Sequence, residues 1–241
     1  MSTEQLKKGI LYLIPTTLGD MAETADVIPL KVNTVINTID EYIVENEKSA
    51  RHYLKKIGIQ KPLPEIVLHT LNQHTPSANI SNYLQVIALG KNVGIISEAG
   101  CPGIADPGAE VVRIAQEKNI TVVPLVGPSS ILLALMASGF NGQSFTFNGY
   151  LPKERSERIK KIKELEKAAL QKQTTQLFIE TPYRNNHLLD DILATCDNNT
   201  KLCVACDITL ASEFIKTKSI GSWKKQVPDL NKRPTIFLIY K

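Results

Sequence analysis

The chain has 241 residues, enough for one large domain or two unequal ones, and its hydrophobic content of 43% is that of a globular rather than a disordered protein. Its formal net charge of +4 permits an anionic partner but does not require one. No run of about 18 apolar residues occurs, so we expect no membrane span and no signal sequence, and we predict a cytoplasmic protein.

The first 139 residues predict strands that alternate with helices, because short apolar runs alternate with apolar residues at helical spacing. This alternation is typical of a parallel, doubly wound sheet with helices on both faces. We therefore predict an N-terminal α/β domain over residues 1–140. The expected strands are residues 9–14, 42–44, 65–68, 93–96 and 121–125, and the expected helices are residues 29–39, 47–57, 80–89, 109–118 and 131–137.

The rest of the chain predicts a second domain, over residues 141–241. The boundary is expected at residues 138–142, which include two glycines. Three of the strands beyond it follow one another without a long helix between them, so we expect a C-terminal α/β domain with a mixed sheet. The expected strands are residues 144–150, 176–180, 202–208, 212–219 and 234–240, and the expected helices are residues 154–170 and 185–196.

Residues 94–108, G-I-I-S-E-A-G-C-P-G-I-A-D-P-G, form the most unusual stretch of the sequence. They begin as a strand and end where a helix is expected, and the glycines and prolines between exclude regular helix or sheet. Glu98 and Asp106 are the only formal charges. Because open α/β sheets bind ligands at the carboxyl ends of their strands, we predict a ligand site here. The alternative is a long structural turn.

Residues 97–108 also resemble the S-D-A-G-T-P-x-I-S-D-P-G segment of the tetrapyrrole methylase superfamily. The resemblance is to the ribosomal RNA small subunit methyltransferase I branch, which methylates a ribose 2′-hydroxyl. Glu98 stands where this branch has Asp, and Cys101 stands where it has Thr. Three more turns resemble the superfamily in the same order: residues 15–20 (A-T-P-I-G-N in the ribose branch), residues 127–130 (P-G-P-S-A) and residues 181–184 (Y-E-S-P-H-R).

The resemblance implies two α/β domains with S-adenosyl-L-methionine in the cleft between them, and a homodimer. It also implies a substrate in the ribosomal RNA of the small ribosomal subunit. We expect most cofactor contacts to come from the main chain of the matched turns, although a serine pair at a helix start is also a normal N-cap. The cofactor-binding residues implied are Pro15, Gly19, Gly100, Cys101, Ile104, Ser129 and Ser130.

A catalytic base is expected because a ribose hydroxyl is a weak nucleophile at neutral pH, and a base speeds such a transfer by roughly 10²–10⁴-fold. The candidates are Glu98, Asp106 and Glu45, with His69 as a further one. Asp106 also has a structural interpretation, since a carboxylate at the start of a helix can cap it.

Basic residues near two of the expected helices are candidates for binding RNA. Arg184 is the preferred phosphate anchor, because a guanidinium group can contact two oxygens at once, and Tyr183 precedes it. Lys153 and Arg155 begin the basic helix expected at residues 154–170. A basic helix face that is merely solvated is the alternative.

Two stretches depart from the ribose branch. Asn-Glu-Lys at residues 46–48 replaces its Asp-Thr-Arg, and Cys206-Asp207 replaces its Arg-Glu. Two other functions therefore stay open: a methyltransferase of the same fold that acts on a tetrapyrrole-like small molecule, and a cofactor-binding protein whose catalysis has decayed. The small-molecule function would call for a glycine-rich first loop, which this sequence lacks.

The four cysteines indicate neither disulfides nor a metal site. Cys203 and Cys206 form a C-x-x-C, but they fall within the strand expected at residues 202–208, where alternate residues face opposite sides. No second C-x-x-C accompanies them, so we predict no bound metal.

Overall fold

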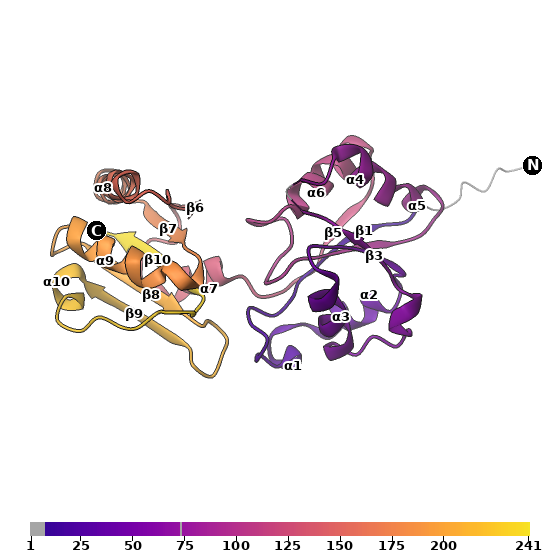
Figure 1. Cartoon of the computed structure of the whole chain (residues 1–241), viewed down its shortest axis with the longest axis horizontal. Coiled ribbons are helices and arrows are strands. Elements are labelled where there is room, and N and C mark those ends of the chain that lie inside the picture. Colours follow the sequence, from indigo (N-terminus) through magenta and orange to yellow (C-terminus); the bar gives the residue numbers. More distant parts are fainter. Residues whose placement is uncertain (1–7, 73) are drawn as a thin grey trace, which may run out of the picture. The chain divides into compact units, whose positions relative to one another are not determined.

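A computed structural model describes residues 8–72 and 74–241, which fold into two α/β units (Figure 1). The first unit ends at Pro128 and the second begins at Ser129, earlier than the boundary expected at residue 140. The reason is helix α7 (Ser130–Ser138), which packs on the second sheet and buries Ala134 and Leu135. In the sequence this helix follows a strand and simply continues the alternation, so the sequence assigns it to the first unit.

The first unit is built on a five-stranded sheet whose neighbouring strands are all parallel, in the order β3-β2-β4-β1-β5. Parallel neighbours need a crossover connection, which the intervening helices supply. Strands β2 and β4 are buried along their whole length, as expected for the centre of such a sheet. The strands are β1 (Leu11–Ile14), β2 (Glu41–Val44), β3 (Val67–Thr70), β4 (Val93–Ile96) and β5 (Val122–Pro124).

Helices cover both faces of this sheet. Successive strand residues face opposite sides, so Tyr42 and Val44 enter the core beneath α2 and α3, while Ile43 and Ile95 enter the core beneath α4, α5 and α6. The helices are α1 (Thr24–Val27), α2 (Leu30–Ile36), α3 (Glu47–Lys56), α4 (Ser77–Tyr83), α5 (Gln85–Ala88) and α6 (Gly108–Glu117).

The chain leaves the neighbouring strands β2 and β4 in opposite directions. β2 leads to β3 at one edge of the sheet, whereas β4 leads past β1 to β5 at the other edge. Connections that diverge in this way open a crevice at the carboxyl ends of the two strands, which is where open α/β sheets bind ligands. The topology therefore points to the segments that follow β2 and β4.

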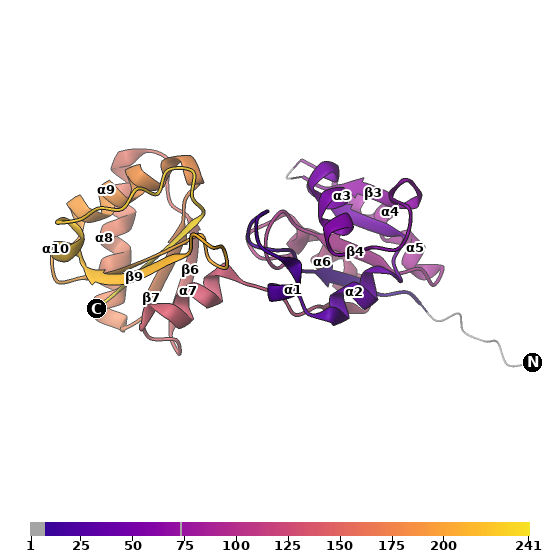
Figure 2. The same cartoon turned by 90° about the horizontal axis from the view of Figure 1, so that it is seen from below.

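The second unit has a mixed sheet in the order β6-β7-β10-β8-β9. Only β6 and β7 pair in parallel among these strands. Helices α8, α9 and α10 share one core on one face of this sheet, whereas α7 lies on the other face (Figure 2). On that other face the Thr217 hydroxyl donates to the carbonyl oxygen of Ser138 at 2.8 Å. The elements are β6 (Phe145–Tyr150), α8 (Arg155–Lys172), β7 (Thr175–Ile179), α9 (Asn185–Thr195), β8 (Lys201–Cys206), β9 (Phe214–Ser219), α10 (Ile220–Trp223) and β10 (Thr235–Tyr240).

The expected class, a parallel α/β sheet followed by a mixed one, is confirmed, with local differences. The strand expected at residues 65–68 is β3, which starts later because a 3₁₀ turn occupies Leu63–Glu65. The helix expected at residues 80–89 is two helices, α4 and α5, which meet at Leu84. Within the described residues, every helix is too short or too polar to cross a membrane.

Candidate active site

Loops from three strands are tied together at the carboxyl edge of the first sheet. The main-chain N–H of Thr16, after β1, donates to the carbonyl oxygen of Gly100, after β4, at 2.8 Å. The thiol of Cys101 donates to the carbonyl oxygen of Pro128, after β5, at 3.4 Å. Gly100 has φ of +74°, a conformation that favours glycine, and a Cβ there would lie 3.3 Å from the same Pro128 oxygen.

Pro15 and Gly127 bring the loops after β1 and β5 into direct contact. A Cβ on Gly127 would lie 2.1 Å from the Cβ of Pro15, so only glycine fits. The Tyr53 hydroxyl donates to the Pro15 carbonyl oxygen at 2.6 Å and joins α3 to the same framework. Of the other cofactor residues expected in this unit, Gly19 lies further along the Pro15 loop and Ile104 exposes its side chain. The expected cofactor residues of the first unit therefore lie on connected loops.

Asp106 holds the loop after β4 in shape. Its two carboxylate oxygens accept from the N–H of Gly103 at 2.9 and 3.0 Å, and Oδ1 also accepts from the N–H of Gly108 at 2.7 Å. Gly108 is the first residue of α6, so the carboxylate closes the turn and satisfies a free helix donor. Burial raises the pKa of Asp106, and these N–H groups oppose that rise. The geometry favours the structural interpretation of Asp106.

Glu45 and Glu98 lie together where β2 and β4 end. The N–H of Glu98 donates to Oε1 of Glu45 at 3.3 Å. Burial raises the pKa of Glu45, the Glu98 N–H partly offsets this, and the negative charges of Asp106 and Glu98 raise it again. The three carboxylates that the sequence predicts as catalytic therefore form one electrostatic group at the carboxyl ends of β2 and β4.

The replacement Glu45→Gln is expected to raise the free energy of unfolding at pH 7. A carboxyl whose folded pKa is raised contributes its full stability below its unfolded pKa, near 4.5, and loses it as the pH rises through the folded value. The variant and the wild type should therefore converge below pH 4.5 and diverge at pH 7. Urea unfolding at both pH values measures this, with the exposed Glu65→Gln as the matched control. A Glu45→Gln protein less stable than wild type at pH 7 would show the opposite sign.

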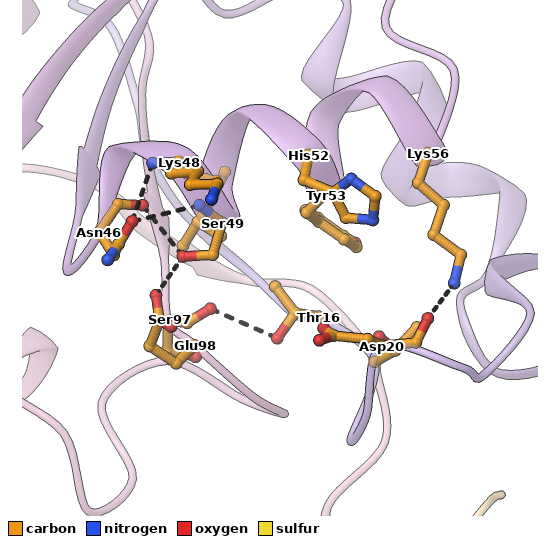
Figure 3. Close-up of a pocket in the computed structure, with 13 residues that line it drawn as sticks. Thr16, Asp20, Asn46, Lys48, Ser49, His52, Tyr53, Lys56, Ser97 and Glu98 are labelled. Carbon is orange, nitrogen blue, oxygen red and sulfur yellow. Dashed lines mark hydrogen bonds between the residues drawn. The ribbon is translucent and has the colours of Figure 1, made fainter.

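A pocket of about 420 Å³ opens beside this acidic group (Figure 3). Its walls are the loop after β1, the start and pocket-facing side of α3, and the residues that end β4 and follow it. Thr16 and Ser97 line it and are joined by a hydrogen bond from the Thr16 hydroxyl to the Ser97 carbonyl oxygen. Of the three carboxylates predicted as catalytic, it is Glu98 that lines this pocket.

The first turn of α3 positions Glu98. Asn46 caps the helix, because its side-chain oxygen accepts from the N–H groups of Lys48 at 2.9 Å and Ser49 at 3.2 Å. The capped turn directs the Ser49 hydroxyl at Glu98, to which it donates at 2.6 Å (Figure 3). Residues 46–48, which differ from the ribose branch, include the Asn46 cap and are followed by Ser49. These residues therefore form an ordered wall of the pocket.

Lys48, His52 and Lys56 continue along one side of α3. They follow at intervals of four residues, which places them on one helix face, and all three line the pocket (Figure 3). The Lys56 ammonium donates at 2.6 Å to the main-chain oxygens of Asp20 and Ala22. Among the described residues, neither Lys48 nor Lys56 has a carboxylate within 4.0 Å. The pocket wall therefore carries positive charge without a neutralising ion pair.

His69, the further candidate base, serves a different part of the sheet. Its Nε2 lies 3.1 Å from a carboxylate oxygen of Glu41, and its ring stacks on Tyr83 with 4.5 Å between ring centroids. The His69 ring therefore lies on the face of the sheet covered by α4, where Glu41 and Tyr83 already contact it. His69 does not line the pocket beside Glu98.

Two expected RNA contacts at the start of α8 have different surroundings. Arg155 Nε donates to Oδ1 of Asp191 at 2.8 Å, and the neighbouring Arg158 donates to Oδ2 of the same residue at 2.8 and 2.6 Å. The Asp191 side chain is only 4% exposed. Arg155 and Arg158 are thus engaged in a structural ion pair, whereas the side chain of Lys153 is exposed.

The turn after β7 carries the other two expected contacts. Arg184 donates from Nη2 to the buried carboxylate of Glu180 at 2.5 Å, which uses part of the guanidinium that was predicted to bind phosphate. Tyr183 is 71% exposed. Earlier in this unit, the Ser129 hydroxyl oxygen accepts from the N–H of Leu132 at 3.5 Å and so caps α7, which begins at Ser130.

The C-x-x-C cysteines are both buried on β8. Cys206 lies in the core beneath α8–α10, whereas Cys203 faces the other side of the sheet. Among the residues that the structure describes, no group of three or more His, Cys, Asp or Glu side chains is placed to hold a metal ion.

The family model for Tetrapyrrole (Corrin/Porphyrin) Methylases matches residues 14–223. The chain belongs to this family. The matched range contains the tied loops, the acidic group and the pocket, so these features lie in the part that this methylase shares with its relatives.

Relatives of this methylase carry the name "Ribosomal RNA small subunit methyltransferase I". A protein of Leptospira biflexa is 35% identical over 162 residues, which are 67% of this chain but 62% of that protein, so the match spans less than two thirds of its length. A protein of Buchnera aphidicola is 30% identical over 97% of this chain and 78% of its own. One of Bacillus subtilis is 31% identical over 86% and 67%.

The fold of this methylase is also found in a solved structure, "Crystal structure of the methyltransferase CobJ". The TM-score is 0.64, and the match covers 97% of this chain and 94% of that chain at 16% sequence identity. At this identity the likeness concerns the fold, and it agrees with the two α/β units described above.

Proposed function

We propose that this chain is an S-adenosylmethionine-dependent methyltransferase that modifies a ribose 2′-hydroxyl in the RNA of the small ribosomal subunit. The observation that carries the proposal is the similarity, over 97% of the chain, to a protein named ribosomal RNA small subunit methyltransferase I. The pocket supports it, because hydroxyl groups, two carboxylates and cations line one cavity at the carboxyl ends of β2 and β4.

The acidic group fits a positively charged cofactor. When bound, S-adenosylmethionine supplies a methyl group already activated on a cationic sulfur. Glu45, Glu98 and Asp106 place negative charge at the end of the sheet, which favours a cation nearby. The exposed apolar side chain of Ile104 suits a nucleoside base. In this proposal the cofactor is held by Pro15, Gly19, Gly100, Cys101 and Ile104, together with Ser129 and Ser130.

Glu98 is the base in this proposal. It lines the pocket, and the Ser49 hydroxyl holds one of its carboxylate oxygens. Glu98 takes the proton of the acceptor hydroxyl, and the pocket orients that hydroxyl for in-line attack. Lys48 and Lys56 attract the phosphates that flank an RNA ribose. Asp106 keeps the loop that carries Glu98 in place, and Glu45 supports Glu98 by accepting a hydrogen bond from the main-chain N–H of Glu98.

RNA outside the pocket is expected to contact the second unit. Lys153 and Tyr183 are the two expected contacts whose side chains are exposed without an ion pair among the described residues. Arg155 is already paired with Asp191 and Arg184 with Glu180, so these two arginines contact RNA through their remaining N–H donors. The proposal also includes a homodimer in the cytoplasm, where ribosomal subunits are made, and light scattering of the purified protein tests the dimer.

Transfer of a labelled methyl group tests the function. The purified protein and labelled S-adenosylmethionine are added to a lysate of cells that lack this protein, and the lysate is then separated into ribosomal subunits, free RNA and small molecules. Label in the small subunit is the expected result. Label among small molecules would support the tetrapyrrole-like alternative, and cofactor binding without any transfer would support the decayed one.

A further inference from the structure

Charge is distributed unequally between the two units. The second unit has 17 Lys and Arg against 11 Asp and Glu, whereas the first has 11 against 13. The formal net charges are therefore +6 and −2. A partner with a phosphate backbone is attracted to the second unit, although net charge alone does not say to which part of it.

Helix α8 carries many of these cations, but carboxylates of the same unit neutralise several of them. Arg155 and Arg158 share Asp191, as described above. Lys160 lies 2.8 Å from Glu157, and Lys161 lies 3.3 Å from Glu164. A cation that already has a carboxylate partner has fewer donors left for a phosphate, so these four cations of α8 are less available than lysines without an ion pair.

Four other lysines of this unit gather around β9 and α10: Lys216, Lys218, Lys224 and Lys225. We call them the β9–α10 lysine cluster. Among the described residues, no carboxylate oxygen lies within 4.0 Å of any of their ammonium groups. The nearby acid Glu213 instead accepts from the N–H of Thr209 at 2.8 Å. None of the four ammonium groups is therefore held in an ion pair among the described residues.

Strand β9 and helix α10 determine on which face of the second sheet the cluster lies. β9 is an edge strand beside α10 (Figures 1 and 2). Lys216 and Lys218 pair with residues of β8 that lie in the core beneath α10, so both lysines are on that face of the sheet. The Lys218 ammonium lies 4.7 Å from the ring centre of Trp223, and Lys224 donates to the side-chain oxygen of Asn198 at 2.7 Å. Both partners are neutral, so they hold the lysines in position without cancelling their charge.

We propose that the β9–α10 lysine cluster is a contact surface for the phosphate backbone of the RNA substrate. The inference rests on the proposed function and adds the place at which the RNA is held outside the pocket. Each lysine that meets a phosphate displaces condensed counterions, which supplies affinity that falls as salt rises. Lysines on an edge strand also prevent pairing with other strands, but that role concerns β9 and does not explain Lys224 and Lys225, which follow α10.

The test compares two variants of the full-length protein that lose the same charge. One replaces Lys216, Lys218, Lys224 and Lys225 by glutamine, and the control replaces four lysines of α8, Lys160, Lys161, Lys163 and Lys167, in the same way. Helix α9 separates α8 from α10 on the same face, so the two sets lie at opposite ends of one helical layer. Affinity for small-subunit RNA is measured at several salt concentrations, alongside cofactor binding.

The cluster variant is expected to bind RNA roughly tenfold more weakly at low salt, with a salt slope smaller by about 2–3 and cofactor binding unchanged. The α8 control is expected to stay near wild type. Equal losses of RNA affinity in both variants would mean that only the net charge of the unit matters. An unchanged salt slope in the cluster variant would mean that the RNA binds elsewhere. Either result overturns the inference. A wild type that transfers no methyl group to small subunits would instead overturn the proposed function.

A milder variant keeps the test valid if the fourfold replacement lowers stability. Lys216→Gln with Lys225→Gln changes two ammonium groups that make no hydrogen bond or ion pair among the described residues. Its salt slope is expected to fall by about 1.4, since single-stranded RNA loses about 0.7 per phosphate contact. A slope equal to that of wild type in this well-folded variant would overturn the inference.

Discussion

Asp106→Ala is expected to lose methyl transfer by roughly 10²-fold or more, because the loop that carries Glu98 would lose its internal brace. The carboxylate accepts from Gly103 and Gly108, and Gly108 is buried. A buried N–H without an acceptor costs about 1–3 kcal/mol, and a loop that relaxes to satisfy it moves the residues around the pocket. Steady-state kinetics measures the rate of methyl transfer, and a titration measures the affinity for the cofactor. Both the rate and the affinity should fall.

Asp106→Asn separates the structural role from a catalytic one. An asparagine oxygen at the position of Oδ1 can accept from both Gly103 and Gly108, so this variant should keep most of the cofactor binding and activity. If Asp106 were the base, asparagine and alanine would be equally inactive, since neither takes a proton. Equal loss in the two variants, with normal cofactor binding, would therefore contradict the structural role.

Asp191→Ala is expected to lower the free energy of unfolding of the second unit by about 3–5 kcal/mol. The Asp191 side chain is 4% exposed and that of Arg158 10%, so the replacement leaves a buried guanidinium without its partner. Differential scanning calorimetry should show the transition of this unit about 10 °C or more lower. Cofactor binding at low temperature should be retained, because no residue of the Glu98 pocket is changed.

The control for this prediction removes both charges. Arg158→Leu with Asp191→Leu fills similar space with apolar groups and should recover most of the lost stability, since a buried pair contributes little beyond its apolar replacement. The expectation is wrong if Asp191→Ala is as stable as wild type. That outcome would mean that the basic start of α8 is not held by this ion pair and is available for RNA after all.

Most of the fold could be predicted because most strands and helices have a local cause, although the four-residue helices α1 and α10 were not expected. Short apolar runs mark β1, β2 and β4, and the N-cap residue Asn46 marks the start of α3. The unit boundary could not be predicted, since α7 has the same local pattern whichever sheet it packs on. Residue periodicity shows that a helix has an apolar face, but not which partner covers that face.

The site could be predicted only in part. The glycine-rich loop and its carboxylates stand together in the sequence, so their place at the carboxyl edge follows from the strand before them. The pocket wall depends on pairs far apart in the chain: Ser49 meets Glu98, and Lys56 reaches Asp20. The four-residue spacing of lysine and histidine along α3 was the available indication, but this spacing shows only that the three residues share a helix face, not what lies opposite that face.

The basic start of α8 shows the reverse situation. The sequence makes it one of the expected phosphate contacts, yet Asp191 lies 33 positions beyond Arg158 and pairs with it in the fold. A list of charges cannot show which are paired, and a paired cation is a poor phosphate ligand. The same reason leaves the β9–α10 lysine cluster inconspicuous in the sequence, although the structure finds no carboxylate beside it among the described residues.

The most direct test of the proposed chemistry is to identify the methylated nucleoside. Small subunits from cells that lack this protein are incubated with it and labelled S-adenosylmethionine, and their RNA is digested to nucleosides and separated by mass. The proposal predicts label in a single 2′-O-methylated nucleoside, and its loss with Glu98→Gln. Label on a base, or no label in RNA while the protein binds the cofactor, would contradict it.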